Sequence, residues 1–87
     1  GYDSLGQTTG SNNTAYGNGA GNGITSGSNN ITIGSNAQVS VATGSNQLNI
    51  GNWIYGSGGY IGIGMTSPTA KLDVSADAKI NGVDIGK

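Results

Sequence analysis

Residues 27–34 read Gly-Ser-Asn-Asn-Ile-Thr-Ile-Gly, and two close copies of this octapeptide occupy residues 10–17 and 44–51. The three copies begin 17 residues apart, with no slippage in the spacing. A constant period of this kind is typical of proteins built from stacked units, in which each unit buries its apolar face against its neighbours. The repeat covers most of residues 1–60 and predicts a stem of equivalent units.

The second copy shows what each unit is expected to contain. Ile31 and Ile33 alternate with polar residues, which is typical of a half-buried strand. Val39 and Val41 repeat this alternation further along the same unit. We therefore expect two short strands and two turns in each repeat. No stretch has the pattern of a long helix, so the predicted fold class is all-β.

Comparison of the copies predicts which side chains point into the stack. The fifth and seventh positions of the octapeptide are mostly apolar and are expected to face inward; they are Thr14, Ile31, Leu48, Tyr16, Ile33 and Ile50. The third position is always asparagine, at Asn12, Asn29 and Asn46. Asparagine at a fixed period suggests either a ladder of side-chain amides or a turn with left-handed backbone geometry.

Composition indicates that one chain makes a poor globule by itself. Only 33% of the 87 residues are hydrophobic and 18 are glycine, which adds no side chain to a core. Small cores usually need disulfides, metals or partner subunits. The chain has no Cys and no His, which excludes disulfides and the usual zinc sites, and we expect no metal or cofactor. We therefore expect the chain to be stabilised by self-association.

Charge is confined to the two ends of the sequence. No charged residue lies between Asp3 and Lys71, and the net charge is −1 with no Arg, so we expect no nucleic-acid surface. No apolar run has membrane-spanning length, so we expect no membrane insertion. Residues 1–9 have the pattern of the tail of an earlier repeat, and the chain lacks an initiator Met. We therefore expect it to be a piece of a longer protein.

The third repeat departs from the others because it is rich in aromatic residues. Trp53, Tyr55 and Tyr60 lie within eight positions of each other. Exposed aromatic rings among Gly and Asn stack well on sugars, which makes these three residues candidate glycan contacts. The alternative is that they fill a wider interior where the array of repeats ends.

Residues 61–87 form a second segment with a different pattern. Residues 61–64 and 71–74 alternate as strands on either side of a turn around Pro68. Residues 78–80 and 83–85 flank Asn81-Gly82, which is a strong signal for a β-hairpin. Uniform Gly-rich strands specify their pairing register weakly, so we expect this charged, aperiodic end to fix the register of the stem.

Two stretches of this chain resemble bacteriophage tail fibres and related trimeric fibre proteins. Residues 8–20 are similar to the repeats of such fibres, and residues 62–74 resemble a Gly-Ile-Gly-Thr-x-Ser-Pro-x-x-Lys-Leu-x-Val junction near their C-terminal parts. Residues 80–83 are similar to the segment that follows this junction. The departures are Met65, where Thr is usual, and Ala78. More loosely, the repeats resemble the head repeats of trimeric bacterial adhesins.

The resemblance implies a repetitive, fibrous homotrimer: a β-helix, β-prism or β-roll of 17-residue repeats that ends in a short β-hairpin. It implies a structural segment of a virion tail fibre that supports attachment to a host cell-surface glycan or protein. A bacterial surface adhesin or self-assembling extracellular filament is one alternative, and a carbohydrate-binding module centred on the aromatic residues is another. No enzymatic activity is expected, because without His, Cys or Glu the usual nucleophile–base pairs cannot be assembled.

Overall fold

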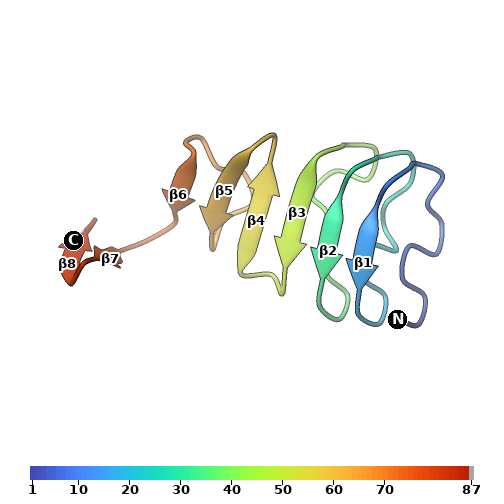
Figure 1. Ribbon diagram of the computed structural model, residues 1–87, viewed down its shortest axis with the longest axis horizontal. Coiled ribbons are helices and arrows are strands. Elements are labelled where there is room, and N and C mark those ends of the chain that lie inside the picture. Colours follow the sequence, from blue (N-terminus) through green and yellow to red (C-terminus); the bar gives the residue numbers. More distant parts are fainter. Residues whose placement is uncertain (87) are drawn as a thin grey trace.

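The computed structural model describes residues 1–86, which form eight short strands and no helix (Figure 1). The strands are β1 (Thr14–Tyr16), β2 (Ile31–Ile33), β3 (Gln47–Ile50), β4 (Ile54–Ser57), β5 (Tyr60–Ile63), β6 (Leu72–Val74), β7 (Ala78–Ile80) and β8 (Val83–Ile85). The first six form one sheet in sequence order, while β7 and β8 pair with each other. The predicted all-β class is confirmed. In this part of the chain no helix is long and apolar enough to cross a membrane.

The 17-residue period of the sequence is the spacing of the stack. β1, β2 and β3 are parallel, and each residue pairs with the one 17 positions later, as in Thr14↔Ile31 and Ile31↔Leu48. The loops follow the same order, since the backbone N–H of Thr25 donates to the carbonyl of Ala42 at 3.0 Å. Each repeat therefore forms one strand and one returning loop, which together we call a rung. The next rung stacks directly on it.

Residues 1–9 belong to an incomplete rung, as their sequence predicts. The N–H of Leu5 donates to the carbonyl of Ala20 at 3.0 Å, and that of Thr9 donates to the carbonyl of Thr25 at 2.8 Å. The segment thus covers the loop of the first complete rung and forms no strand of its own.

The prediction of two strands in each repeat is wrong, because the stretch around Val39 and Val41 forms none. Its backbone groups are taken by side chains instead. The N–H of Val41 donates to Gln47 Oε1 at 3.0 Å, and Gln47 Nε2 donates to the carbonyl of Val41 at 2.9 Å. The carbonyl of Gln38 accepts from Asn49 Nδ2 at 2.7 Å. These three backbone groups are therefore bonded to side chains and not to a neighbouring strand.

Side-chain amides, which we call the amide ladder, run through the interior at Asn13, Asn30 and Gln47. Asn13 Oδ1 accepts from the N–H of Asn30 at 3.0 Å, and Asn30 Oδ1 accepts from the N–H of Gln47 at 2.9 Å. Asn30 Nδ2 donates to the carbonyl of Gly44 at 3.0 Å. Each amide therefore ties its own rung to the next, and buried polar groups of this kind are stable only when paired.

The amide ladder lies one position later in the octapeptide than the sequence suggested. The third-position residues Asn12, Asn29 and Asn46 have φ of 59°, 58° and 61°, which is the left-handed region. Among residues 1–86 their side chains make no hydrogen bond, whereas their backbones make the turn that enters each strand. The turn interpretation of these three residues is confirmed, and the ladder interpretation is wrong for them.

The apolar residues that were expected to face inward do not line the interior of the single chain. Within residues 1–86 the fully buried hydrophobic residues are Ala20, Ile24 and Ala37, and the buried polar residues are Asn30, Thr32, Gln47 and Asn49. Thr32 is 0% exposed, whereas Ile31 and Ile33 on either side of it are exposed. The loop lies close to the strand at this point: a Cβ on Gly21 would lie 2.9 Å from Thr32 Oγ1. Apart from Ile24, small and amide side chains fill the narrow interior.

The direction of the chain reverses after the third rung. β4 pairs antiparallel with β3 after a turn at residues 51–53, and β5 pairs antiparallel with β4 across Gly58-Gly59. β6 then pairs parallel with β5. The strands predicted near residues 61–64 and 71–74 and the hairpin across Asn81-Gly82 are confirmed. The predicted division after residue 60 falls at the first residue of β5 and stays a prediction.

Two substitutions at buried polar positions should differ in their effect on the free energy of unfolding. Asn30→Ala should lower the free energy of unfolding by about 2–4 kcal/mol, because it leaves the Gln47 N–H and the Gly44 carbonyl unpaired. Thr32→Val should leave this free energy unchanged or raise it, because Thr32 Oγ1 is buried and has no partner within the described residues. Guanidinium unfolding at one protein concentration measures both. Equal losses in the two variants would contradict the role given to the amide ladder.

Candidate functional site

One face of the six-stranded sheet is lined by apolar side chains along its whole length. Side chains alternate between the two faces of a strand, and the pairing register carries the same alternation from strand to strand. We call this surface the apolar face; it consists of Tyr16, Ile31, Ile33, Leu48, Ile50, Ile54, Ile61, Ile63, Leu72 and Val74, with Thr14 and Gly56 completing its two columns.

The apolar face is open to solvent. Tyr16 is 77% exposed and Leu72 is 61% exposed, and Ile31, Ile33 and Ile63 are exposed as well. The remaining apolar members are half-buried. The loops of the rungs cover the opposite face, where Thr32 and Asn49 are buried. Contiguous exposed apolar surface of this kind marks an interaction site in a folded protein.

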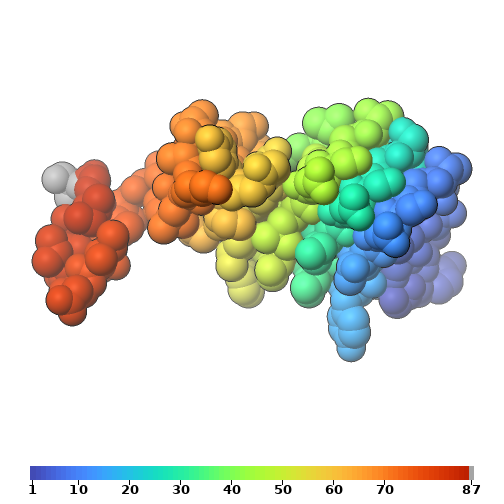
Figure 2. All heavy atoms as spheres, turned by 45° about the horizontal axis from the view of Figure 1, so that its top comes forward, coloured from blue at the N-terminus to red at the C-terminus, as the bar shows by residue number. Residues whose placement is uncertain are grey.

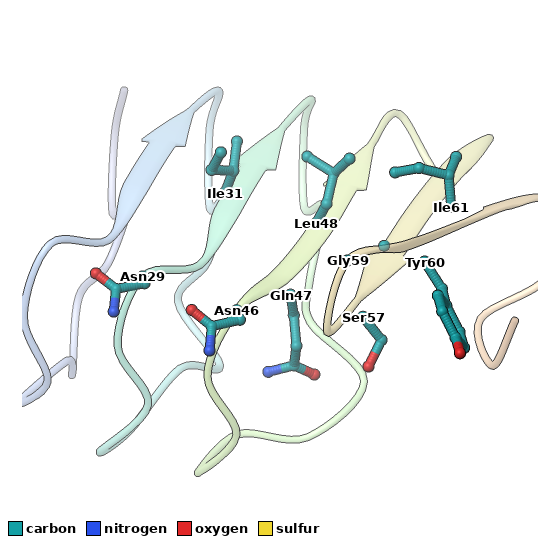
Figure 3. A pocket seen from close by; sticks show the side chains of 10 residues that line it. Asn29, Ile31, Asn46, Gln47, Leu48, Ser57, Gly59, Tyr60 and Ile61 are labelled. Carbon is teal, nitrogen blue, oxygen red and sulfur yellow. The ribbon is translucent and has the colours of Figure 1, made fainter. Parts of the chain in front are cut away.

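A hollow of about 280 Å³ interrupts this face at Gly56, the one glycine in its two columns (Figure 3). Ile31, Leu48 and Ile61 project to one side of it, while Asn29, Asn46, Ser57 and Tyr60 project to the other. A Cβ at Gly56 would lie 2.9 Å from Leu48 Cβ and 3.4 Å from Ile61 Cδ1. Because residue 56 has no side chain, Leu48 and Ile61 pack close to its backbone.

The three candidate glycan contacts do not form one site. Trp53 precedes β4, whereas Tyr60 pairs with Ser57 at the far end of that strand, so roughly 13 Å of backbone separates their positions. Tyr55 is half-buried beside Asn49 on the opposite face, and its hydroxyl donates to the carbonyl of Asn52 at 3.0 Å.

The two outer aromatic residues differ in their surroundings. Trp53 is 70% exposed and so lies outside the interior of the single chain, with its ring over Gly51. The ammonium group of Lys71 lies 5.9 Å from the centre of the Tyr60 ring, within the range of a cation–π contact. Trp53 is thus a single exposed platform rather than part of an aromatic cluster.

In the part of the chain that the structure describes, no three acidic side chains lie close enough together to hold a metal ion. Asp73 is used locally, since its Oδ2 accepts from the N–H of Thr69 at 3.0 Å and from the Thr69 hydroxyl at 3.2 Å. Lys79 and Asp84 lie across the hairpin from each other, with Nζ and Oδ1 3.8 Å apart. The apolar face is therefore the candidate site with the most support.

Sequence reasoning missed the extent of this face beyond the third rung. Ile54, Ile61 and Ile63 join it because β4 and β5 form a hairpin on the edge of β3. The signal was present at Gly58-Gly59, since two glycines between alternating residues favour a two-residue hairpin turn. Their φ values of 60° and 93° are those that glycine adopts without strain.

Comparison with protein-family models, with curated proteins and with solved structures finds no match to this chain. Function is therefore argued from the geometry of the apolar face, together with the sequence resemblance to fibre proteins.

Gly56→Val should lower the free energy of unfolding by about 1–3 kcal/mol, because the new side chain must push Leu48 and Ile61 apart. The matched control is Ser57→Val, the next residue of the same strand, whose exposed side chain should change stability by less than about 0.5 kcal/mol. Thermal or denaturant unfolding at one protein concentration compares them. Indistinguishable stabilities would contradict the close packing around Gly56.

Proposed function

We propose that this chain is a structural segment of a homotrimeric fibre of the bacteriophage tail-fibre type, which supports attachment to a host cell surface. Three copies would join through their apolar faces, each copy being a β-roll of 17-residue rungs. The observation that carries the proposal is the contrast between a polar interior and an apolar exterior. Within residues 1–86 one large hydrophobic side chain, Ile24, is fully buried, while the apolar face runs across all six strands.

The geometry of the stem supports a spacer role. The described residues extend over 44 × 22 × 15 Å, with the rungs stacked along the long direction (Figure 1). The amide ladder repeats the same interactions at each rung and needs no large apolar core. A segment built in this way gains length by adding rungs and remains stiff, because each rung is hydrogen-bonded to the next.

The number of copies and the biological setting rest on the sequence resemblance. The junction at residues 62–74 is its most specific part and favours a phage fibre over a bacterial adhesin of similar architecture. We assign the segment a structural rather than an enzymatic role, because its recognisable features are repeats and an interaction surface. Sedimentation equilibrium tests the assembly directly, and the expected mass is three times the 8.5 kDa of one chain.

Substitutions on the two faces of β2 separate association from folding. Ile33→Asp should leave a folded chain that no longer associates, because it places a charge on the apolar face. Thr32→Asp should prevent folding, because its carboxylate would lie in an interior that is closed to solvent. Circular dichroism reports on folding, and sedimentation velocity reports on association.

The milder variant Ile33→Ser keeps this test informative if the aspartate variant does not fold. It should weaken association measurably while the β signal in circular dichroism persists. A monomeric wild-type chain at all concentrations, or an Ile33→Asp chain that associates like the wild type, would overturn the proposed assembly.

Carbohydrate binding is the second candidate function, and the exposure of Trp53 is the observation that favours it. Trp53→Ala should abolish retention on immobilised glycans and leave the mass of the assembly unchanged, since the ring lies outside the apolar face. The conservative control is Trp53→Phe, which keeps an aromatic platform. Equal retention of wild type and Trp53→Ala would remove this candidate.

A further inference from the structure

The C-terminal strands β7 and β8 form a hairpin that stands apart from the six-stranded sheet (Figure 1). Residues 75–77 link it to β6, and in Figure 2 it is a separate lobe at one end of the molecule. Its strands pair antiparallel through Ala78↔Ile85, Lys79↔Asp84 and Ile80↔Val83. Asn81 and Gly82 make the turn, with φ of 50° and 77°. We call this element the terminal hairpin.

The two faces of the terminal hairpin differ in chemistry. Alternation places Ala78, Ile80, Val83 and Ile85 on one face, and Lys79 and Asp84 on the other. Ile80, Val83 and Ile85 are all exposed. On the opposite face, Lys79 Nζ lies 3.8 Å from Asp84 Oδ1, and both side chains are exposed to solvent. An apolar face and a charged face on so small an element indicate that one side is covered and the other meets water.

A two-stranded hairpin is marginally stable by itself in water and needs a further strand or a packing partner. An exposed ion pair between Lys79 and Asp84 contributes too little to replace such packing. No other strand of the described chain pairs with β7 or β8. The terminal hairpin is therefore the part of the chain that depends most on a partner.

The apolar side of the terminal hairpin continues the apolar face of the sheet. Leu72 and Val74 of the apolar face border the same hollow, of about 410 Å³, as Ile80 and Ile85 of the hairpin. The two surfaces thus open to the same side. A partner that covers the apolar face at β6 would reach the hairpin as well.

We propose that the apolar side of the terminal hairpin packs against the terminal hairpins of other copies of this chain and sets the axial register of the assembly. The proposal rests on the proposed association through the apolar face and deepens it. Two observations favour a second copy as the occupant: the hollow is shared with the apolar face and is lined by aliphatic side chains apart from Lys79, and the exposed side chains on the apolar side of the hairpin are the same aliphatic types as those of the apolar face.

The repeats of the stem do not by themselves fix the axial alignment of one chain relative to its neighbours. A slip of one rung places Ile31 where Leu48 was and Ile33 where Ile50 was, so aliphatic side chains again occupy these two positions. The terminal hairpin occurs once, and a slipped neighbour would leave its apolar side uncovered. Burial of all the hairpins therefore selects the arrangement in which the chains are level.

The test compares two double variants of the whole chain that alter opposite faces of the same two strands. Ile80→Ser with Val83→Ser removes apolar side chains, and Lys79→Ser with Asp84→Ser removes the charged pair. Hydrogen exchange of the amides in residues 78–85 reports on the hairpin, and sedimentation velocity reports on uniformity. The first variant should exchange about tenfold faster or more in this segment and give a mixture of staggered assemblies. The second should match the wild type in both measurements.

The outcomes distinguish this proposal from the proposed function. A wild-type chain that stays monomeric overturns both. A uniform assembly with unchanged hairpin exchange in Ile80→Ser/Val83→Ser overturns the hairpin proposal alone and leaves association through the stem intact. Slow exchange of residues 78–85 in the monomeric Ile33→Asp chain would also overturn it, because the hairpin would then be stabilised by its own chain or by its turn.

Discussion

Hydrogen bonds between the buried amides and the backbone of the next rung are the constraint from which the stem follows. The Asn30 side chain accepts from the N–H of Gln47 and donates to the carbonyl of Gly44, and the Asn30 backbone N–H donates to Asn13 Oδ1. Buried amides are costly unless they are paired, and within a closed interior each pair is stronger than in water. A slip of a single residue within the chain would break these pairs at every rung, so the interior fixes the rungs relative to each other without a large apolar core.

A polar interior has a consequence for the outside of the molecule. The loops lie close against β1, β2 and β3, and the space between loop and strand is filled by threonine, amide and alanine side chains with one isoleucine, Ile24. The aliphatic residues of the repeat therefore lie on the far side of the same strands, where the chain does not cover them. Folding of one chain therefore leaves these aliphatic side chains in contact with water, and the proposed association would bury them.

The sequence predicts the period, the all-β class, the strands near residues 31–33, 61–64 and 71–74, and the terminal hairpin, because these depend on local alternation and turn chemistry. It does not predict which side of each strand is covered. Alternation of Ile31, Thr32 and Ile33 defines two faces, yet burial of the aliphatic one is an assumption that holds only when the covering loop leaves room. The extent of the apolar face was missed for a related reason, since the pairing of β4 with β3 depends on contacts beyond the local turn.

The end of the array can be traced to one change in the amide ladder. At Asn13 and Asn30 the side-chain nitrogen donates forward, to carbonyls 14 residues later at Gly27 and Gly44. Gln47 is the third member of the amide ladder. Its longer side chain turns back along the chain, so that Nε2 donates to the carbonyl of Val41 and Oε1 accepts from the N–H of Val41. The side chain of Gln47 therefore bonds to Val41 and Asn30, which precede it in the chain, and not to a following rung. The chain then reverses at residues 51–53, and antiparallel strands, which need no interior amide, extend the apolar face beyond the last rung.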